Sequence, residues 1–371
     1  MKIVFKSKNA GKAILLLLIS AHFSCVLVAR TAFLPPQIKK SNWYRGVYHV
    51  HSNYSHDSKA TLEMISETAG QAGLDFIVVT DHNNMDAKKA YQPKPKDPLL
   101  IVGTEISTWH DGHLGVIGVK EMPPDIGEIQ KILDWIHAHH GFAIPAHPYS
   151  KRKPWKAMDL PKIDAIEIFC FSDLFYENTA KLMTQAIFFP SDQFLKSALK
   201  VNPEGLQWWD NRLSAGEQIS ALAATDAHLK WRLGNFYAEN LLLYFQSVTM
   251  YAHADQLNSE NIVRSLANGN TFIAFEIFGI AQDFSFTAAA ENRVFHCGET
   301  ALGEHLLFHV KVPKEADIKL IHNGKIVEFV RSQTLEYSAN EPGYYRVEVY
   351  EGGKLWILTN PIYFTQESGL A

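Results

Sequence analysis

Short apolar runs alternate with amphipathic segments over about the first 280 residues of the chain. Continuous apolar runs of four to nine residues are typical of strands that are buried on both faces. We therefore predict an inner strand in each of these runs: residues 74–80 (LDFIVVT), 99–107 (LLIVGTEIS), 113–119, 142–148, 164–170, 219–228, 240–247 (NLLLYFQS) and 271–279.

Three segments between these runs place apolar residues on one helical face: residues 61–73, 125–141 and 258–269. Strands that alternate with helices predict parallel strands joined by helical crossovers. The number of strands favours a closed or nearly closed β/α barrel. An open doubly wound sheet is the alternative, although no Gly-rich turn marks a dinucleotide site. The barrel is expected to span residues 43–280.

The pattern changes to a period of two from about residue 284. Residues 306–312, 318–330 and 343–360 alternate apolar and polar positions. Asn323-Gly324 and Gly352-Gly353, inside the second and third of these segments, are expected to be hairpin turns. No helical pattern intervenes. We therefore predict that residues 284–371 form a small antiparallel β-sandwich of the immunoglobulin-like kind, with a structural or binding role.

The first 34 residues have the pattern of an export signal or a membrane anchor. Four lysines and no acidic residue precede an apolar run at residues 13–29. The positive flank is expected to stay in the cytoplasm, which places the rest of the chain in the periplasm or another extracytoplasmic space. Whether the segment is cleaved as a signal peptide or retained stays open. The run is short for a membrane span, and no clear cleavage site follows it.

Composition narrows the range of functions further. A formal net charge of -4 argues against broad binding to nucleic acid, which requires a basic face. The three cysteines form neither a disulfide framework nor a C-x-x-C motif. With 17 histidines in the chain, several of them clustered, any metal site is expected to use imidazole and carboxylate ligands.

Histidines and acids recur where the predicted strands begin or end. His49 and His51 are two residues apart on one strand and so point to the same face. Reactive groups collect at the carboxyl-terminal mouth of a β/α barrel. Carboxylates and imidazoles buried together there need cations to offset their charge and desolvation, and so they predict divalent metals. The remaining candidates at strand ends are Asp81, His82, Glu105, His113, His147, Asp226 and His228.

The ordered motifs HVHSNYSHDS, TDHN, GTEIS, GHL, PAHP and TDAH resemble those of the PHP (polymerase and histidinol phosphatase) superfamily of metallohydrolases. The resemblance covers residues 43–279 and implies a distorted (β/α)7 barrel with a trinuclear metal site. The motif WYRG before the first histidines and LTNPIYF near the end are similar to the carbaryl hydrolase-like branch.

Carried over to this chain, the resemblance implies three groups of ligands. The first is His49, His51, Glu105 and Asp226. The second shares Glu105 and adds His113 and His147, and the third is Asp57, His82 and His228. Many members have an acid where this chain has His56, so His56 is the alternative to Asp57. Asp81 is expected to orient a ligand from behind, while His110, His137, His139 and His140 match no motif and are expected at the surface or behind the ligands.

These ligands suit two to three ions of zinc, manganese or iron. The leading hypothesis is a phosphoesterase of small phosphate mono- or diesters, in which a metal-bridging hydroxide attacks, with Glu105, Asp226 and His228 as catalytic residues. The alternative is a carbamate, carboxylic ester or amide hydrolase with the same metals, and a third possibility is a non-catalytic sugar- or lipid-binding module.

Arg152, Lys230 and Arg232 are the candidate substrate-binding residues, or else a solvated basic surface. Apart from a small-molecule ester, the expected partner is the membrane, through the N-terminal segment alone.

Overall fold

The computed structural model describes residues 42–159, 162–177, 191–230, 232–233, 236–237, 240–290 and 293–366. The predicted N-terminal signal or anchor, residues 1–34, lies outside the described residues. None of the helices in the described ranges is both long enough and apolar enough to cross a membrane.

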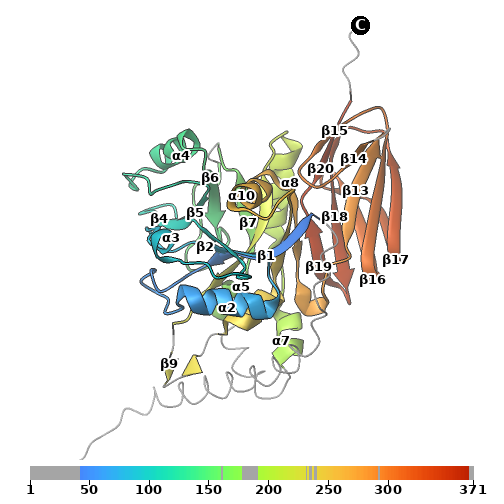
Figure 1. The fold of residues 1–371 in the computed structure, drawn as a ribbon. Helices are drawn as coiled ribbons and strands as arrows, with labels where there is room; N and C mark the ends of the chain where they lie inside the picture. Colours follow the sequence, from blue (N-terminus) through green and yellow to red (C-terminus); the bar gives the residue numbers. More distant parts are fainter. Residues whose placement is uncertain are drawn as a thin grey trace, which may run out of the picture.

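Parallel strands form the centre of the α/β part, in the order β7-β8-β1-β2-β3 (Figure 1). All four residues of β2 are buried, as its continuous apolar run predicts. The strands of this part are β1 (Trp43–Val50), β2 (Phe76–Val79), β3 (Leu99–Val102), β4 (Thr104–Ser107), β5 (His113–Ile117), β6 (Phe142–Ala146), β7 (Ala165–Cys170), β8 (Ser220–Ala227), β9 (Arg232–Leu233), β10 (Phe236–Tyr237), β11 (Thr249–His253) and β12 (Thr271–Ala274).

The three predicted helices are confirmed within the predicted segments. α2 begins after Thr61, whose side chain accepts a hydrogen bond from the backbone N–H of Met64, and α10 begins after Asn258 and ends at Gly269 with φ of 74°. The described helices are α2 (Leu62–Ala72), α3 (Ala87–Ala90), α4 (Ile129–Ala138), α5 (Phe171–Glu177), α7 (Ser191–Ala198), α8 (Pro203–Ser214), α9 (Leu241–Ser247), α10 (Ser259–Asn268) and a 3-10 turn at Glu276–Phe278.

The run at residues 240–247 is a helix, α9, and its prediction as a strand is wrong. Asn240 caps the helix by accepting hydrogen bonds from the backbone N–H groups of Leu242 and Leu243. Six of its seven residues are buried. A helix that is buried all round has no polar face, and so its sequence reads as a continuous apolar run like that of an inner strand.

The strand ladders of the described residues do not close into a barrel, which corrects the prediction of a closed or nearly closed one. Strands β4, β5 and β6 form a separate antiparallel sheet. The chain passes from β3 to β4 at Gly103, where a Cβ atom would lie 2.4 Å from the carbonyl oxygen of Val116. This close approach lets one extended segment leave the parallel sheet and pair with β5 instead.

The C-terminal region consists of antiparallel strands and stands beside the α/β part (Figure 1). Hairpin turns at Asn323-Gly324 and Gly352-Gly353 join its strands, as predicted. Its strands are β13 (Ser285–Ala290), β14 (Arg293–Phe295), β15 (Thr300–Leu302), β16 (Leu306–His322), β17 (Lys325–Ala339), β18 (Gly343–Glu351), β19 (Lys354–Thr359) and β20 (Ile362–Thr365).

A ladder between β12 and β19 joins this region to the α/β sheet. The predicted boundary between the two parts, at residues 280–284, therefore does not divide the hydrogen-bonded sheet. Phe286, Phe308, Tyr345 and Trp356 belong to a second core cluster. The assignment of residues 284–371 as a separate immunoglobulin-like domain stays a prediction.

Candidate metal centre

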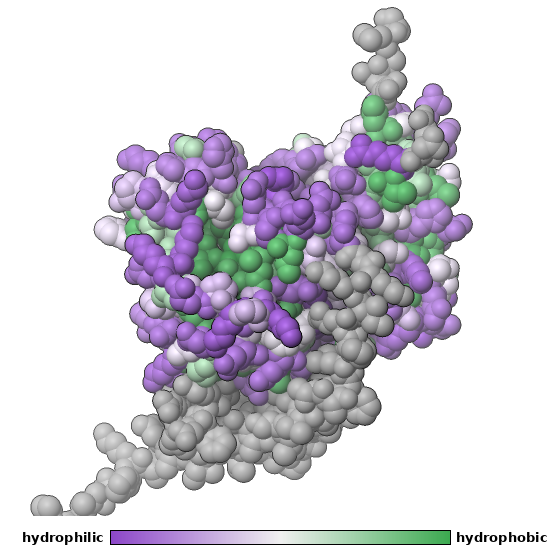
Figure 2. Space-filling model, in the orientation of Figure 1, coloured by the Kyte–Doolittle hydropathy of each residue, from purple (hydrophilic) through white to green (hydrophobic). Residues whose placement is uncertain are grey.

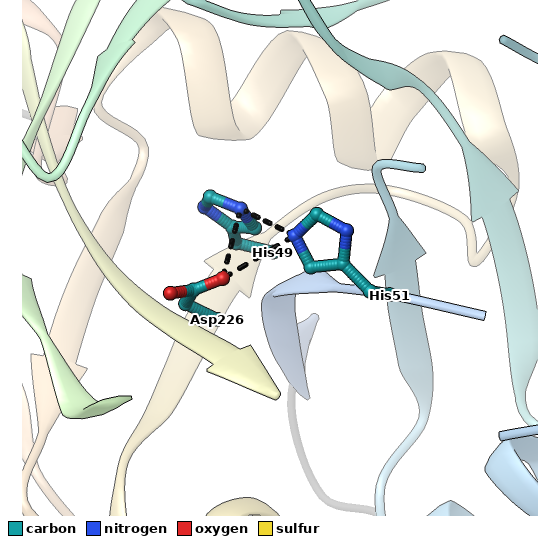
Figure 3. A group of neighbouring side chains, drawn as sticks. All are labelled: His49, His51 and Asp226. Atoms are coloured by element: carbon teal, nitrogen blue, oxygen red, sulfur yellow. Dashed lines mark hydrogen bonds and ion pairs between the residues drawn. The ribbon is translucent and has the colours of Figure 1, made fainter. Parts of the chain in front are cut away.

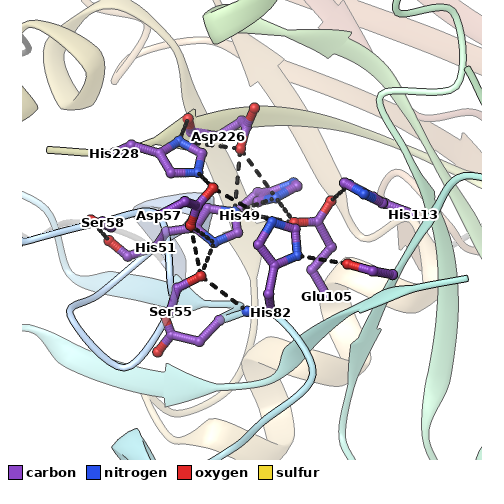
Figure 4. A network of polar contacts seen from close by, with 12 residues as sticks. His49, His51, Ser55, Asp57, Ser58, His82, Glu105, His113, Asp226 and His228 are labelled. Carbon is purple, nitrogen blue, oxygen red and sulfur yellow. Dashed lines mark hydrogen bonds and ion pairs between the residues drawn. The ribbon is translucent and has the colours of Figure 1, made fainter. Parts of the chain in front are cut away.

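Nine predicted side chains from seven separate segments meet at one place in the α/β part, and Figure 4 labels all of them except His147. His49, Glu105, His113 and Asp226 lie on β1, β4, β5 and β8, Asp57 belongs to the loop after β1, and the others follow β1, β2, β6 and β8. Four groups of three residues each place their ligand atoms within 4.8 Å of one another: His49, His51 and Asp226; His51, Asp57 and His228; His51, His82 and Glu105; and Glu105, His113 and His147.

Glu105 lies at the centre of the cluster and is 1% exposed. Its Oε1 atom lies 2.8 Å from His113 Nδ1 and 3.1 Å from His147 Nε2. Its Oε2 atom lies 3.2 Å from the Nε2 atoms of both His49 and His51 and 3.3 Å from His82 Nδ1. One carboxylate therefore contacts the imidazoles of both sides, as the predicted bridging ligand would.

His49, His51 and Asp226 form the group shown in Figure 3. The Nε2 atoms of the two histidines lie 3.0 Å apart, and Asp226 Oδ1 lies 3.5 Å from the first and 3.3 Å from the second. His49 lies on β1 and His51 directly follows the strand, and both imidazoles reach Asp226.

Asp57, and not His56, joins the cluster. Its Oδ2 atom lies 3.0 Å from His228 Nε2 and 3.6 Å from His82 Nε2. The geometry at His228 Nε2 is not that of a hydrogen bond, so this buried nitrogen has no hydrogen-bond partner among the described residues. His56 is exposed, and its ring centroid lies 5.0 Å from that of His82.

Three residues of the cluster have left-handed backbone conformations, which residues with a side chain seldom adopt. The φ angles are 67° at His49, 32° at His147 and 46° at Asp226. Each stands at or just beyond the end of a strand. Such conformations cost free energy and persist where the surroundings require them, which is common at functional sites.

The close contacts within the cluster shift the pKa values of its members. Burial lowers the pKa of His51, but hydrogen bonds to Asp226 and Glu105 outweigh it and raise the pKa to about 9. Burial likewise lowers the pKa of His147, but Glu105 raises it to about 9. Burial raises the pKa of Glu105 and Asp226, yet the surrounding histidines hold both well below the usual range.

The donor set and the buried nitrogen of His228 fit divalent cations. Imidazoles and carboxylates crowd together at distances of about 3 Å, and an ion placed among them satisfies the negative charges and the nitrogen lone pairs at once. Such a cation would take the place of protons on the histidines.

Glu167 contacts the cluster and was missed by the sequence analysis. Its Oε1 atom lies 2.6 Å from His49 Nδ1, and its Oε2 atom accepts a hydrogen bond of 2.6 Å from the backbone N–H of His147. The signal in the sequence is an acid inside the apolar run DAIEIFC. Ser172 was also missed, and its hydroxyl donates to Asp226 Oδ2 at 2.5 Å.

Asp81 holds the loop that follows β1 in place. Its carboxylate accepts hydrogen bonds of 2.6 Å from both the backbone N–H and the hydroxyl of Ser52. Asp81 was predicted to orient a ligand by direct contact. Its carboxylate instead contacts Ser52, the residue that follows His51. Of the histidines without a motif, His110, His139 and His140 are exposed, and His137 lies 2.9 Å from an oxygen of Asp164.

A cavity of about 370 Å³ opens onto the cluster. Of the predicted substrate-binding residues, Arg152 and Lys230 line it, together with Lys153. The side chain of Arg232 lies outside the described part of the chain. Every described residue that lines the cavity is polar or charged. On the face shown in Figure 2 the surface is mostly hydrophilic, and apolar residues show in a hollow at the middle of the α/β part.

Residues 48–187 match the sequence model of the PHP domain family. The matched segment contains the cluster residues up to His147, while Asp226 and His228 lie beyond it. None of the curated proteins matches the chain. A candidate metal-dependent phosphoesterase of known structure from Bifidobacterium adolescentis is 11% identical, over 53% of this chain and 93% of that chain, with a TM-score of 0.34.

Proposed function

Because the chain carries a PHP domain and is a metal-dependent hydrolase of that superfamily, we propose that it hydrolyses small phosphate mono- or diesters. The observation that carries the proposal is the lining of the cavity. Arg152, Lys153 and Lys230 surround an opening that leads to the His/Asp/Glu cluster. Cationic side chains bind phosphate through charge-assisted hydrogen bonds. A site for a carbamate or a carboxylic ester would be expected to have more apolar walls.

The proposed ligands fall into the three groups given by the resemblance, with Asp57 in the third. His49, His51 and Asp226 would hold one ion, His113 and His147 a second, and Glu105 would bridge the two. Asp57, His82 and His228 would hold the third. Zinc, manganese and iron all suit imidazole and carboxylate ligands. Bound divalent metals supply a nucleophile at neutral pH and polarise a phosphoryl oxygen.

The side chains of the cavity then divide the remaining work. Arg152 and Lys153 bind the phosphate oxygens and orient the ester. Lys230 lies 3.6 Å from Asp57 Oδ2, beside the proposed third group, and we assign this side, with His228, to the leaving oxygen. Glu105 and Asp226 fix the ligand geometry through their contacts with the histidines.

A substrate screen on purified, metal-reconstituted protein tests the proposal. The protein is expected to turn over p-nitrophenyl phosphate or bis-p-nitrophenyl phosphate with added Mn²⁺ or Zn²⁺, and a chelator is expected to abolish the activity. Turnover of phenyl acetate or a naphthyl carbamate with both phosphates untouched would favour the carbamate and ester hydrolase alternative, which the similarity to the carbaryl hydrolase-like branch allows. Tight metal binding without turnover of any ester would favour a binding module.

The proposed architecture around the site is a distorted (β/α)7 barrel. Two contacts support it across the gaps between ladders. An isolated parallel bridge pairs His82 with Glu105, and the backbone N–H of Asp164, just before β7, donates to the carbonyl of Ala143 on β6. In the proposed barrel, β4 to β6 would complete a wall around the cluster through these contacts.

We also propose that the enzyme acts outside the cytoplasm. The support is the lysine-rich start and the apolar run at residues 13–29. Fractionation of cells that express the full chain is expected to place it in the periplasm or on the membrane, with the barrel accessible to added protease in spheroplasts. Recovery in the cytoplasm alone would contradict this proposal and leave the chemistry of the site untouched.

A further inference from the structure

Glu167 is a buried carboxylate to which the proposed function gives no role. It is 2% exposed, lies on β7, and belongs to none of the four ligand groups found among the described residues. Its two oxygens contact two different histidines of the cluster, His49 and His147. These histidines belong to different proposed metal ions.

The contact with His49 selects one form of the imidazole ring. Glu167 Oε1 lies 2.6 Å from His49 Nδ1. An ionised carboxylate can only accept hydrogen bonds, so Nδ1 carries the hydrogen. His49 Nε2 is then free to present its lone pair to the cluster, where it faces Asp226 Oδ1. The opposite tautomer would place a hydrogen where the ion has to bind.

The contact with His147 stabilises an unfavourable backbone conformation. The N–H of His147 donates to Glu167 Oε2, and the φ angle of His147 is 32°. This conformation turns the chain after β6, and His147 Nε2 thereby reaches Glu105 Oε1 at 3.1 Å. One carboxylate thus sets the ring of one ligand and the backbone of another.

An irregularity in β7 helps to place this carboxylate. Along the ladder with β8, Glu167 pairs with Leu222 but Phe169 pairs with Ala223, so the register shifts between them. An extra residue of this kind bends a strand and changes the direction of its side chains.

We propose that Glu167 is a positioning residue for the metal centre, which fixes the tautomer of His49 and the backbone of His147 so that both offer Nε2 to cations. The inference rests on the ligands assigned under the proposed function, but not on the identity of the ester. Carboxylates that accept from the outer nitrogen of a metal-binding histidine also raise the basicity of that ligand.

A glutamine at this position is a specific test because it retains only one acceptor oxygen. Both partners of Glu167 are donors, since the backbone N–H of His147 cannot accept. The amide NH₂ group of Glu167→Gln must therefore face one of them. Either the N–H of His147 loses its acceptor, or His49 changes tautomer and its Nε2 no longer binds metal.

The experiment compares Glu167→Gln and Glu167→Asp with Glu276→Gln in the full chain. Glu276 is a matched control, because it is a buried acid that accepts hydrogen bonds from Arg45 Nε at 2.9 Å and Tyr251 at 2.7 Å. The measurements are Zn²⁺ and Mn²⁺ affinity by competition with a chelating dye, the rise in Tm on metal binding, and ¹⁵N spectra of labelled histidines. Glu167→Gln is expected to weaken metal binding about 10- to 100-fold and to reduce the rise in Tm. Where the amide NH₂ group faces His49, the variant also loses the Nδ1–H signal of this ring; where it faces His147, the signal is kept.

Glu276→Gln is expected to keep the metal affinity of the unaltered protein, even if its metal-free Tm falls. Glu167→Asp retains two acceptors on a shorter side chain that cannot reach both donors, so it is also expected to bind metal more weakly, and it decides the question if Glu167→Gln does not fold. Wild-type metal affinity in either Glu167 variant would overturn the inference. Absence of metal binding by the unaltered protein would instead overturn the proposed function.

Discussion

Asn360, just beyond β19 in the C-terminal region, hydrogen-bonds both backbone groups of Ala221 on β8. Its Oδ1 accepts from the N–H of Ala221 at 2.7 Å, and its Nδ2 donates to the carbonyl of Ala221 at 3.0 Å. Nδ2 also contacts Thr271 Oγ1 at 2.8 Å. The same strand β8 carries Asp226 of the metal cluster. The C-terminal strands therefore secure the strand on which part of the site is built.

Replacing Asn360 with alanine is expected to lower the free energy of unfolding by about 2–4 kcal/mol, because buried backbone groups of Ala221 lose their partners. Urea unfolding followed by circular dichroism measures the change. Asn340→Ala is the control, since Asn340 lies at an exposed position and contacts His305. Equal stability of the two variants would contradict the expectation.

Glu105→Gln and Asp226→Asn are expected to lose bound metal and to reduce kcat by at least about 100-fold, because each change removes a buried charge that the cations need. Metal content by mass spectrometry and turnover of p-nitrophenyl phosphate are measured on the same sample. Asp164→Asn is a suitable control, since Asp164 contacts His137 away from the cluster. Full metal occupancy with full activity in Glu105→Gln would remove the bridge from the proposed site.

The choice between His56 and Asp57 can be made with one pair of variants. Asp57→Asn is expected to lower the metal content, because Asp57 Oδ2 faces both His228 and His82. His56→Asn is expected to leave the metal content unchanged, because His56 is exposed and outside the four ligand groups of the described chain. The reverse pattern would make His56 the ligand.

Arg152→Ala and Lys230→Ala are each expected to raise KM for a phosphate ester about 10- to 100-fold, since a charge-assisted hydrogen bond contributes on the order of 1.5–3 kcal/mol. Steady-state kinetics with p-nitrophenyl phosphate give KM and kcat separately. Lys151→Ala is the control, because Lys151 is exposed on the same loop and does not line the cavity. Similar KM values in all three variants would indicate that the basic loop is only a solvated surface.

Two histidines at the junction of the two regions predict a pH dependence that does not involve the metal. The rings of His253 and His296 lie 4.4 Å apart, beside Trp43. Burial lowers the pKa of both, and for His253 the neighbouring His296 adds to the effect, while Glu299 opposes it for both and Asp255 for His253.

Since the folded protein binds these protons less readily than the unfolded chain, their effect is absent above the unfolded pKa of about 6.5. As the pH falls below that value, the unfolded chain takes up protons first and stability decreases. His296→Gln is therefore expected to lose less stability than the unaltered protein between about pH 6.5 and 5. Denaturant midpoints at several pH values, with saturating metal throughout, test this. Parallel curves for the two proteins would contradict it.

The sequence by itself determined the features that depend on local spacing. Histidines two residues apart on a strand, acids and histidines directly after apolar runs, helix caps at Thr61 and Asn258, and turns at Asn323-Gly324 depend on a few neighbouring residues. These features pointed to eight of the nine side chains that the structure brings together, and the ninth, Asp57, came from the resemblance, with His56 as its alternative.

Only the tertiary structure decided features that depend on contacts between distant segments. The pattern of α9 is the same for any element that is buried on all sides, so only packing makes it a helix. The passage of the chain from β3 to β4 at Gly103 involves a close approach to Val116, and the place of Asp57 depends on His228. Glu167 lies beside a register shift in β7, and its partners His49 and His147 belong to distant segments of the chain. Spacing along the chain encodes which groups can act together, whereas the direction and burial of each group follow from long-range packing.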